Sequence, residues 1–204
     1  WELLASDCLN MLGKVYYNQS SYDTALNYLT EALAIHKALG DQKRLGRSHF
    51  DVGRVYLHRG NNQKALGLFE QGLAISKSIG DEKNLIRGYN DIAIVYGGLR
   101  DLATASDYFN KALVLAERTQ ILDGLSQTYM NLAVLYNIKR DYKLSKEYRI
   151  KALEISVKQN DRINIGIHLN SLGQLANNQG NIEKSLIYYD SAIVLFDALG
   201  HDYH

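Results

Sequence analysis

A short pattern of residues returns every forty positions along the whole chain. In each repeat an apolar residue is followed by a small residue, and we call this small residue the marker of the repeat. The markers are Gly13, Gly53, Ala93, Ala133 and Gly173. Three residues after the marker stand Tyr16, Tyr56, Tyr96, Tyr136 and, as the one departure, Ala176. A fixed period of 20–50 residues is the signature of stacked-repeat proteins. Five passes without an insertion therefore predict a repeat architecture.

Two further columns of small residues follow the markers at constant distance. The first holds Ala25, Ala65, Ala105, Ser145 and Ser185, and the second holds Ala32, Gly72, Ala112, Ala152 and Ala192. Helix backbones approach closely only where one partner has a small side chain, and large residues at helical spacing fill the space between them. The pattern thus predicts two packed helices in every repeat. We expect an all-α fold, a right-handed α-solenoid of five tandem helix-turn-helix repeats.

These columns resemble the tetratricopeptide repeat over the whole chain. The usual repeat of that family has about 34 residues and a proline near its end, whereas this chain has a forty-residue period and no proline. The longer repeat is similar to those of kinesin light chains, Leu-Gly-Asn spindle-orientation proteins, bacterial Rap-type peptide receptors and bacterial sensor kinases. The resemblance implies a non-catalytic scaffold that binds a peptide or a partner-protein segment in a concave groove. It also implies the sensory or scaffolding part of a larger regulatory protein.

The period places five repeats at about residues 1–40, 41–80, 81–120, 121–160 and 161–200 of a single solenoid over residues 1–204, with 201–204 beginning a further segment. Glycine followed by aspartate ends the first two repeats, where a left-handed residue and an N-cap are expected. Gln120 and Ile121 replace this pair after the third repeat, so we expect an altered turn there. Gly97 and Gly98 are expected to end the first helix of the third repeat early. Because the sequence begins with Trp1, we expect it to be a fragment of a larger protein.

The balance of charge excludes a broad attraction to nucleic acid. The chain has 23 Lys and Arg against 22 Asp and Glu, so no basic field forms. No run of apolar residues approaches the ~20 that span a membrane, and we expect no membrane insertion.

The single cysteine, Cys8, has no partner for a disulfide within the chain, and we expect it to be a small buried residue of the first helix. We expect the protein to be cytoplasmic.

No arrangement of residues predicts catalysis. The six histidines show no HExxH spacing, and neither a CxxC pair nor a glycine-rich phosphate loop occurs. His201 and His204 are spaced as neighbours on a helix, which suits either an incidental metal ion or a solvated terminus. The tyrosines of the repeat columns are expected in the core. We predict that the chain is not an enzyme and uses no cofactor or metal.

The inner face of the solenoid is the predicted site. By the resemblance, the first helix of each repeat lines the groove, and its non-packing residues meet the ligand. The residues expected there are Asn10, Lys14, Tyr17, Arg47, Phe50, Arg54, His58, Arg87, Asn90, Ile94, Met130, Val134, Asn137, Asn170 and Gln174. Arginine grips a carboxylate through two bonds, and asparagine pairs with a peptide backbone. We expect a protein or peptide ligand that is acidic near the N-terminal repeats and apolar further on; the alternative is that these cations are only solvated and are offset by nearby aspartates.

Other functions stay open beside this one. The last predicted helix, residues 182–199, carries Leu186, Ile193 and Phe196 with no further helix to cover them, so the chain could self-associate as a homo-oligomer. An allosteric small-peptide receptor of the Rap type is a further alternative. A receptor for chaperone tails is not expected, because co-chaperone domains of the family need amides or cations where this chain has Asp51 and Asp91.

Overall fold

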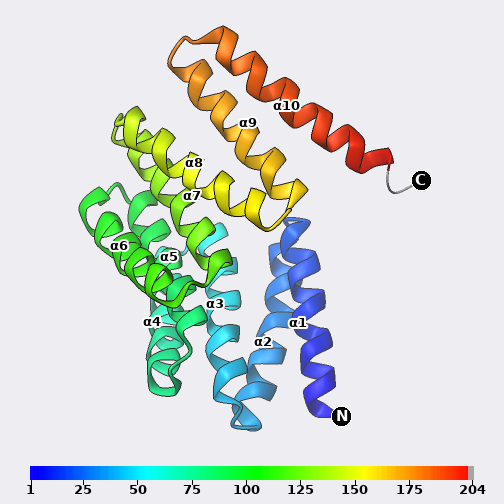
Figure 1. Cartoon of the computed structure of the whole chain (residues 1–204). Coiled ribbons are helices and arrows are strands. Elements are labelled where there is room, and N and C mark those ends of the chain that lie inside the picture. The colour runs from blue at the N-terminus through cyan, green and yellow to red at the C-terminus, as the bar shows by residue number, and fades with distance from the viewer. Residues whose placement is uncertain (202–204) are drawn as a thin grey trace. The chain divides into compact units, whose positions relative to one another are not determined.

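The structure is a computed structural model that describes the backbone of residues 1–201 and the side chains of residues 1–198. Within this range it contains ten α-helices and no strand (Figure 1). The chain divides into two compact units, unit 1 over Trp1–Thr119 and unit 2 over Gln120–His204. The boundary falls where the glycine-aspartate pair is missing from the sequence.

Consecutive helices pair in both units. Unit 1 contains α1 (Glu2–Asn18) with α2 (Tyr22–Ala38), α3 (Gln42–His58) with α4 (Asn62–Ile79), and α5 (Glu82–Gly98) with α6 (Leu102–Thr119). Unit 2 contains α7 (Leu122–Ile138) with α8 (Tyr142–Lys158), and α9 (Arg162–Asn178) with α10 (Ile182–His201). Within each unit the second helix of a pair also packs against the first helix of the next. The predicted all-α repeat solenoid is confirmed, while its right-handed twist stays a prediction.

Every turn between these helices contains one residue with left-handed backbone, and these residues recur at every twentieth position from Ser20 to Gly180. Gly60 has φ 76°, which glycine adopts without strain. Gln120 has φ 54°, so the turn after the third repeat keeps the left-handed residue of the other turns. The difference lies in the N-cap that follows. Ile121 has no side chain that can accept a hydrogen bond, whereas Asp41 accepts one from the backbone N–H of Arg44 at 3.0 Å.

The small residues of the columns make room for aromatic rings. A Cβ on the marker Gly53 would lie 2.5 Å from Cε1 of Phe69, and a Cβ on Gly72 of the second column would lie 2.8 Å from Cζ of Phe50. Both rings are fully buried, and their centroids are 6.3 Å apart. The small-residue columns therefore mark close approaches between helices, as predicted from the sequence.

The tyrosines after the markers pack in pairs. Ring centroids are 5.5 Å apart in the nearly parallel pair of Tyr16 with Tyr28, and 6.0 Å apart in the equivalent pair of Tyr96 with Tyr108. In unit 2 the pair of Tyr136 with Tyr148 repeats the arrangement at 5.6 Å. These rings are partly rather than fully buried, so they close the edge of the core.

Several local predictions are corrected. Cys8 is exposed rather than buried, because it lies on the side of α1 that no other described helix covers. α5 runs through Gly97 to Gly98 and is as long as α3, so the two glycines do not end it early. α10 continues to His201, beyond the predicted end at residue 199. Residues 202–204, and with them the further segment and the histidine pair considered above, lie outside the described side chains. None of the described helices is long and apolar enough to cross a membrane.

Candidate functional site

A ladder of ion pairs joins the first helices of the three repeats in unit 1. Lys14 Nζ on α1 lies 3.2 Å from Oδ2 of Asp51 on α3, and Arg54 Nε on α3 lies 2.9 Å from Oδ1 of Asp91 on α5. In both pairs the cation directly follows the marker of its repeat, and the acid stands two residues before the next marker. The forty-residue period thus repeats an interaction as well as a packing contact.

Asp51 is the centre of this ladder. Besides Lys14, it receives a hydrogen bond from Arg87 on α5 and one from Asn10 Nδ2 at 3.2 Å. The carboxylate is only 5% exposed. Burial alone would raise its pKa, but the charges of Arg87 and Lys14 outweigh burial and hold the pKa of Asp51 below its usual value. Asp51 therefore stays ionised and ties three helices together.

Asp91 is the second buried acid of the ladder, at 3% exposed. Arg54 Nε donates to both of its oxygens, at 2.9 and 3.1 Å, and Arg87 Nε is more distant at 3.9 Å. Burial raises the pKa of Asp91 in spite of these cations. For Arg54, burial alone would lower the pKa, but Asp91 reverses the effect and raises it. The guanidinium of Arg54 is therefore held in its charged form.

The inner face of unit 1 keeps an excess of positive charge. Three cations, Lys14, Arg54 and Arg87, meet only two buried carboxylates. Arg47, one turn from Asp51 on α3, is exposed and has no ion-pair or hydrogen-bond partner among the described residues. An acidic ligand would therefore find one unpaired cation and a net positive ladder on the same helices.

A cavity of about 310 Å³ opens beside the ladder, with charged, polar, aromatic and apolar lining: Lys14, Tyr17, Asn18, Leu29, Asp51, Arg54 and Arg87. Aromatic rings border Tyr17, since its ring centroid is 5.2 Å from that of His58, which stacks on Tyr22 at 5.6 Å. Sites that hold small ligands or parts of ligands have volumes from about 300 Å³ upward. The cavity therefore suits one or two residues of a peptide.

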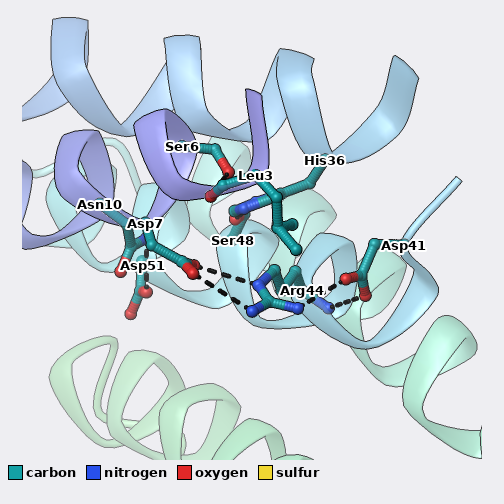
Figure 2. A network of polar contacts seen from close by, with 9 residues as sticks. All are labelled: Leu3, Ser6, Asp7, Asn10, His36, Asp41, Arg44, Ser48 and Asp51. Carbon is teal, nitrogen blue, oxygen red and sulfur yellow. Dashed lines mark hydrogen bonds and ion pairs between the residues drawn. The ribbon is translucent and has the colours of Figure 1, made fainter. Parts of the chain in front are cut away.

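A second polar network fixes the other end of α1 on α3 (Figure 2). Arg44 lies between two acids, with Nε 3.0 Å from Asp7 and Nη1 2.8 Å from Asp41. These hydrogen bonds lower the pKa of Asp7. Nearby, His36 Nδ1 and Ser48 Oγ are 2.8 Å apart and join α2 to α3. This network is occupied by its own partners and explains the orientation of α1.

Two of the predicted groove residues lie in the core. Phe50 is fully buried between Gly72 and Gly88, so it supports the inner face without contacting a ligand, and its assignment to the groove is corrected. Asn90 is 3% exposed, and its Nδ2 donates to the carbonyl of Ile86 on the same helix. Both residues stand at sequence positions equivalent to predicted groove residues in other repeats, but here a neighbouring helix covers the side chain.

The remaining predicted residues lie at or near the surface of their unit. Lys14, Tyr17, Arg54 and His58 surround or border the cavity, and Ile94 is 41% exposed on α5. The members in unit 2 lie on α7 and α9, where Val134, Asn170 and Gln174 are exposed and Met130 and Asn137 are partly buried. A groove that continues from one unit into the other stays a prediction.

The sequence prediction missed Asn18 and Leu29 as cavity residues and treated the aspartates only as a background charge. The ladder had a signal in the sequence: a cation one residue after the marker, and an acid two residues before the next marker. That signal occurs twice, at Lys14 with Asp51 and at Arg54 with Asp91, and ends where Ile94 and Asn131 replace the charges.

The family follows from the sequence together with this architecture. Two models of the family described as Tetratricopeptide repeat match residues 5–78 and 126–156. The chain is a tetratricopeptide repeat protein. The family's alternating helices account for the paired packing of α1 to α6 and of α7 to α10. None of the curated protein sequences matches the chain.

Solved structures share the fold of this tetratricopeptide repeat protein. BtubC (BKLC) from P. vanneervenii is 22% identical, with a TM-score of 0.75 over 98% of this chain and 82% of that one. A Rap protein complexed with competence and sporulation factor is 19% identical, with a TM-score of 0.84 over 96% of this chain and 55% of that one. The Rap conjugation gene regulator of the plasmid pLS20, in complex with the Phr* peptide, is 16% identical, with a TM-score of 0.79 over 94% of this chain and 53% of that one. At these identities the likeness concerns the fold alone.

Proposed function

We propose that this tetratricopeptide repeat protein is a non-catalytic module that binds an acidic peptide or partner-protein segment on the inner face of unit 1. The observation that carries the proposal is the positive ladder of Lys14, Arg54 and Arg87 beside a cavity, with Arg47 exposed and unpaired. Such a module would serve as the sensory or scaffolding part of a larger regulatory protein.

The ladder is a favourable base for binding because its cations are held in place before a ligand arrives. Arg54 and Arg87 are bonded to Asp91 and Asp51, which fixes their side chains and lowers the entropy lost on binding. The same bonds neutralise part of their charge. Arg47 is exposed and has no ion-pair partner among the described residues, so it is the cation that a ligand carboxylate can pair with fully.

Two structural neighbours support a peptide as the ligand. The Rap protein and the Rap conjugation gene regulator were solved with a competence and sporulation factor and with the Phr* peptide, respectively. Their fold is shared over nearly the whole of this chain, although this chain spans only about half of theirs. A small signalling peptide is therefore included in the proposal as one form of acidic ligand.

The test uses two labelled pools of random peptides, acetylated and amidated at their ends, with a fixed Asp-Glu centre in one and Asn-Gln in the other. We expect the protein to bind the acidic pool more tightly in fluorescence anisotropy. Arg47→Glu should weaken that binding by about tenfold or more, since it replaces an attraction with a repulsion worth about 1.4 kcal/mol or more. Substitutions of Arg54 or Arg87 are unsuitable, because they would leave Asp91 or Asp51 buried without a partner.

Lys77→Glu provides the matched control, since Lys77 is exposed on α4, the second helix of its repeat. It makes the same change of charge away from the first helices and should leave binding within about twofold. Equal affinity for the two pools, or equal losses from Arg47→Glu and Lys77→Glu, would contradict the proposal.

A second candidate function, self-association, is favoured by the apolar surface of α10. Its exposed side chains include Ile182, Leu186, Ile187, Ile193, Val194 and Phe196, each between 42% and 67% exposed. A continuous apolar surface of this kind marks an interaction site in soluble proteins. A second copy of the chain is the proposed partner.

A further inference from the structure

Arg149 stands in a column that is otherwise built for the core. The equivalent residues of the five repeats are Leu29, Phe69, Phe109, Arg149 and Tyr189. The first three are between 0% and 4% exposed, and Arg149 is 7% exposed. The fourth repeat therefore buries an arginine where the earlier repeats bury a hydrophobic side chain.

This guanidinium has no counter-charge. Among the residues that the structure describes, no acid forms an ion pair with Arg149, and its Nε is buried without a hydrogen-bond partner. Burial lowers the pKa of Arg149, and no neighbouring acid opposes the effect. The buried acids of unit 1, by contrast, are all matched by cations such as Arg54 and Arg87. A buried donor without an acceptor costs stability, and the packing of α8 gives no reason for an arginine at this position.

The repeat register makes Arg149 the counterpart in unit 2 of a residue that lines the cavity of unit 1. Its counterpart Leu29 lines the cavity of unit 1, and α8, which carries Arg149, packs between α7 and α9. The counterparts of the other cavity residues Lys14, Tyr17, Asp51 and Arg54 are Val134, Asn137, Ser171 and Gln174. Ser171 thus stands where unit 1 has an acid, which leaves the positive charge of Arg149 available.

Asn137 gives a second, independent sign of an unfilled site. Its Oδ1 is buried and accepts no hydrogen bond. A buried acceptor without a donor costs free energy, as does a buried donor without an acceptor. Asn137 Oδ1 therefore lacks a donor and Arg149 Nε lacks an acceptor among the described residues, and a peptide carries both kinds of group.

The other polar groups near Arg149 do not neutralise it. His168 on α9 is 4% exposed, both of its ring nitrogens lack partners, and burial lowers its pKa, so the imidazole is neutral at pH 7. Asp161, the acid that acts on His168, caps α9 and accepts hydrogen bonds from the backbone and side chain of Asn164 at 3.0 and 2.6 Å.

We propose that Arg149, with Asn137 and Gln174, binds a carboxylate of a peptide on the inner face of unit 2. A peptide carboxylate offers oxygens for the two-bond grip of a guanidinium, and the neighbouring backbone N–H satisfies the Asn137 oxygen. This site deepens the proposed function and rests on its general part, that the protein binds a peptide, but not on binding in unit 1; it assigns to unit 2 a polar anchor where the sequence predicted an apolar one. The carboxylate can belong to a peptide C-terminus or to an Asp or Glu side chain.

The experiment follows the Nε–Hε signal of Arg149 in 15N–1H spectra of the whole chain during titration. The probes are acetyl-Gly-Gly-Gly with a free carboxylate, acetyl-Gly-Asp-Gly-amide, and acetyl-Gly-Asn-Gly-amide as the neutral control. We expect a saturable shift with one or both carboxylate probes, at a dissociation constant of about 1–10 mM for ligands of this size, and none with the control. A shift with the first probe alone assigns the site to a C-terminus, and a shift with the second alone assigns it to an acidic side chain.

Arg149→Leu restores the residue type of the first repeat and should fold at least as stably as the wild type, because it replaces a buried charge with an apolar side chain. Binding, followed on the amide signals of α7 and α9, should be lost in this variant and retained in Lys143→Ala, which removes an exposed cation from the same helix. The absence of any shift in the wild type, an equal shift with the neutral control, or full binding by Arg149→Leu would overturn the proposal.

Arg47→Glu separates this site from the function proposed for unit 1. If Arg47→Glu abolishes binding of the acidic pool but leaves the Arg149 response unchanged, both proposals hold. If the acidic pool fails to bind the wild type while Arg149 responds, the site in unit 2 stands and the function proposed for unit 1 falls. Failure of the Arg149 signal to respond, with binding of the acidic pool intact, rejects only the site in unit 2.

Discussion

At the scale of single residues, two buried carboxylates hold α1, α3 and α5 together in unit 1. Asp51 and Asp91 are 5% and 3% exposed, yet each bonds to a cation from a neighbouring repeat. A buried ion pair adds little stability over a hydrophobic contact, but removing one partner leaves a charge in a medium that solvates it poorly. The acids therefore matter most for the orientation of the cations in the proposed binding site.

Asp51→Asn should destabilise unit 1 by about 2–3 kcal/mol, at or just below the low end of the ~3–5 kcal/mol for a broken buried pair, because Lys14 and Arg87 keep some contact with water. The free energy of unfolding is measured by urea unfolding, followed on the amide signals of α3. Asp107→Asn is the control, since Asp107 is exposed on α6, and it should change stability by less than about 0.5 kcal/mol. Similar losses in the two variants would show that the ladder contributes nothing specific.

His168 makes the stability of unit 2 depend on pH. Because burial lowers the pKa of His168, the unfolded chain binds a proton more readily than the folded one. Its contribution is complete above the unfolded pKa of about 6.5 and is lost as the pH falls below it, by up to about 1.4 kcal/mol per pH unit. His168→Thr should remove this pH dependence from the stability of α9. Threonine is the chosen replacement because Thr128 stands at the equivalent position of the preceding repeat and is fully buried.

The check is urea unfolding between about pH 7.5 and 5.5, the range in which histidine titrates. In unit 1, burial also lowers the pKa of His36 and His49, so the signals of α3 should keep their pH dependence in His168→Thr. A wild-type α9 whose stability does not fall with decreasing pH would rule out the buried neutral histidine.

At the scale of helices, small residues and N-caps decide how well each pair is defined. Gly53 lets α3 approach the ring of Phe69 on α4, while Gly67 on α4 has no atom within 4 Å of the place of a Cβ. The helices also differ in whether a side chain caps their first turn. Asp81 accepts from the backbone N–H of Asn84 at 3.1 Å, but Ile121 leaves the start of α7 without a side-chain cap.

Gly53→Ala and Gly67→Ala should change stability in opposite directions. The added methyl group at residue 53 meets Phe69 at 2.5 Å, and overpacking of this kind costs about 1–3 kcal/mol. At residue 67 the methyl group is free of contacts and only lowers the flexibility of the helix, which should add about 0.5–1 kcal/mol. Thermal unfolding of the two variants beside the wild type tests this, and stabilisation by both would mean that α3 and α4 pack less closely than described.

At the scale of the whole molecule, the described chain consists of two repeat units whose boundary coincides with the uncapped start of α7. Each unit buries its own core: Phe50 and Phe69 are fully buried in unit 1, and Leu132 is fully buried in unit 2. Repeats contact mainly their neighbours, so stability is close to a sum over helix pairs and their interfaces. The exposed apolar side chains of α10 are then the surface through which we propose that two copies associate.

Self-association through α10 should make the sedimentation coefficient rise with protein concentration. Leu186→Lys combined with Ile193→Lys should abolish the rise, because these residues are two turns apart on one side of α10 and are 56% and 55% exposed. Val114→Lys is the control, since Val114 is 66% exposed on α6, and it should leave the association intact. A wild-type chain that stays monomeric at high concentration would end this hypothesis.

The forty-residue period determined the helices, their pairing and the family, because small and aromatic columns act through contacts between neighbours in sequence. The positions of Gly53 and Gly72 against Phe69 and Phe50 follow from that pattern. The predicted groove follows from it only in part. Lys14 and Arg54 line the cavity, and binding by any of the predicted residues stays a prediction.

Only the tertiary structure decided which side chains are covered. Phe50 is buried and Cys8 is exposed, the reverse of the sequence prediction, because exposure depends on whether a neighbouring helix passes over a given side of α3 or α1. The sequence likewise shows Arg149 as one more charged residue. Its significance appears only when α7 and α9 enclose α8 and no acid comes with them, since the energy of a charge is set by its surroundings and not by its position in a repeat.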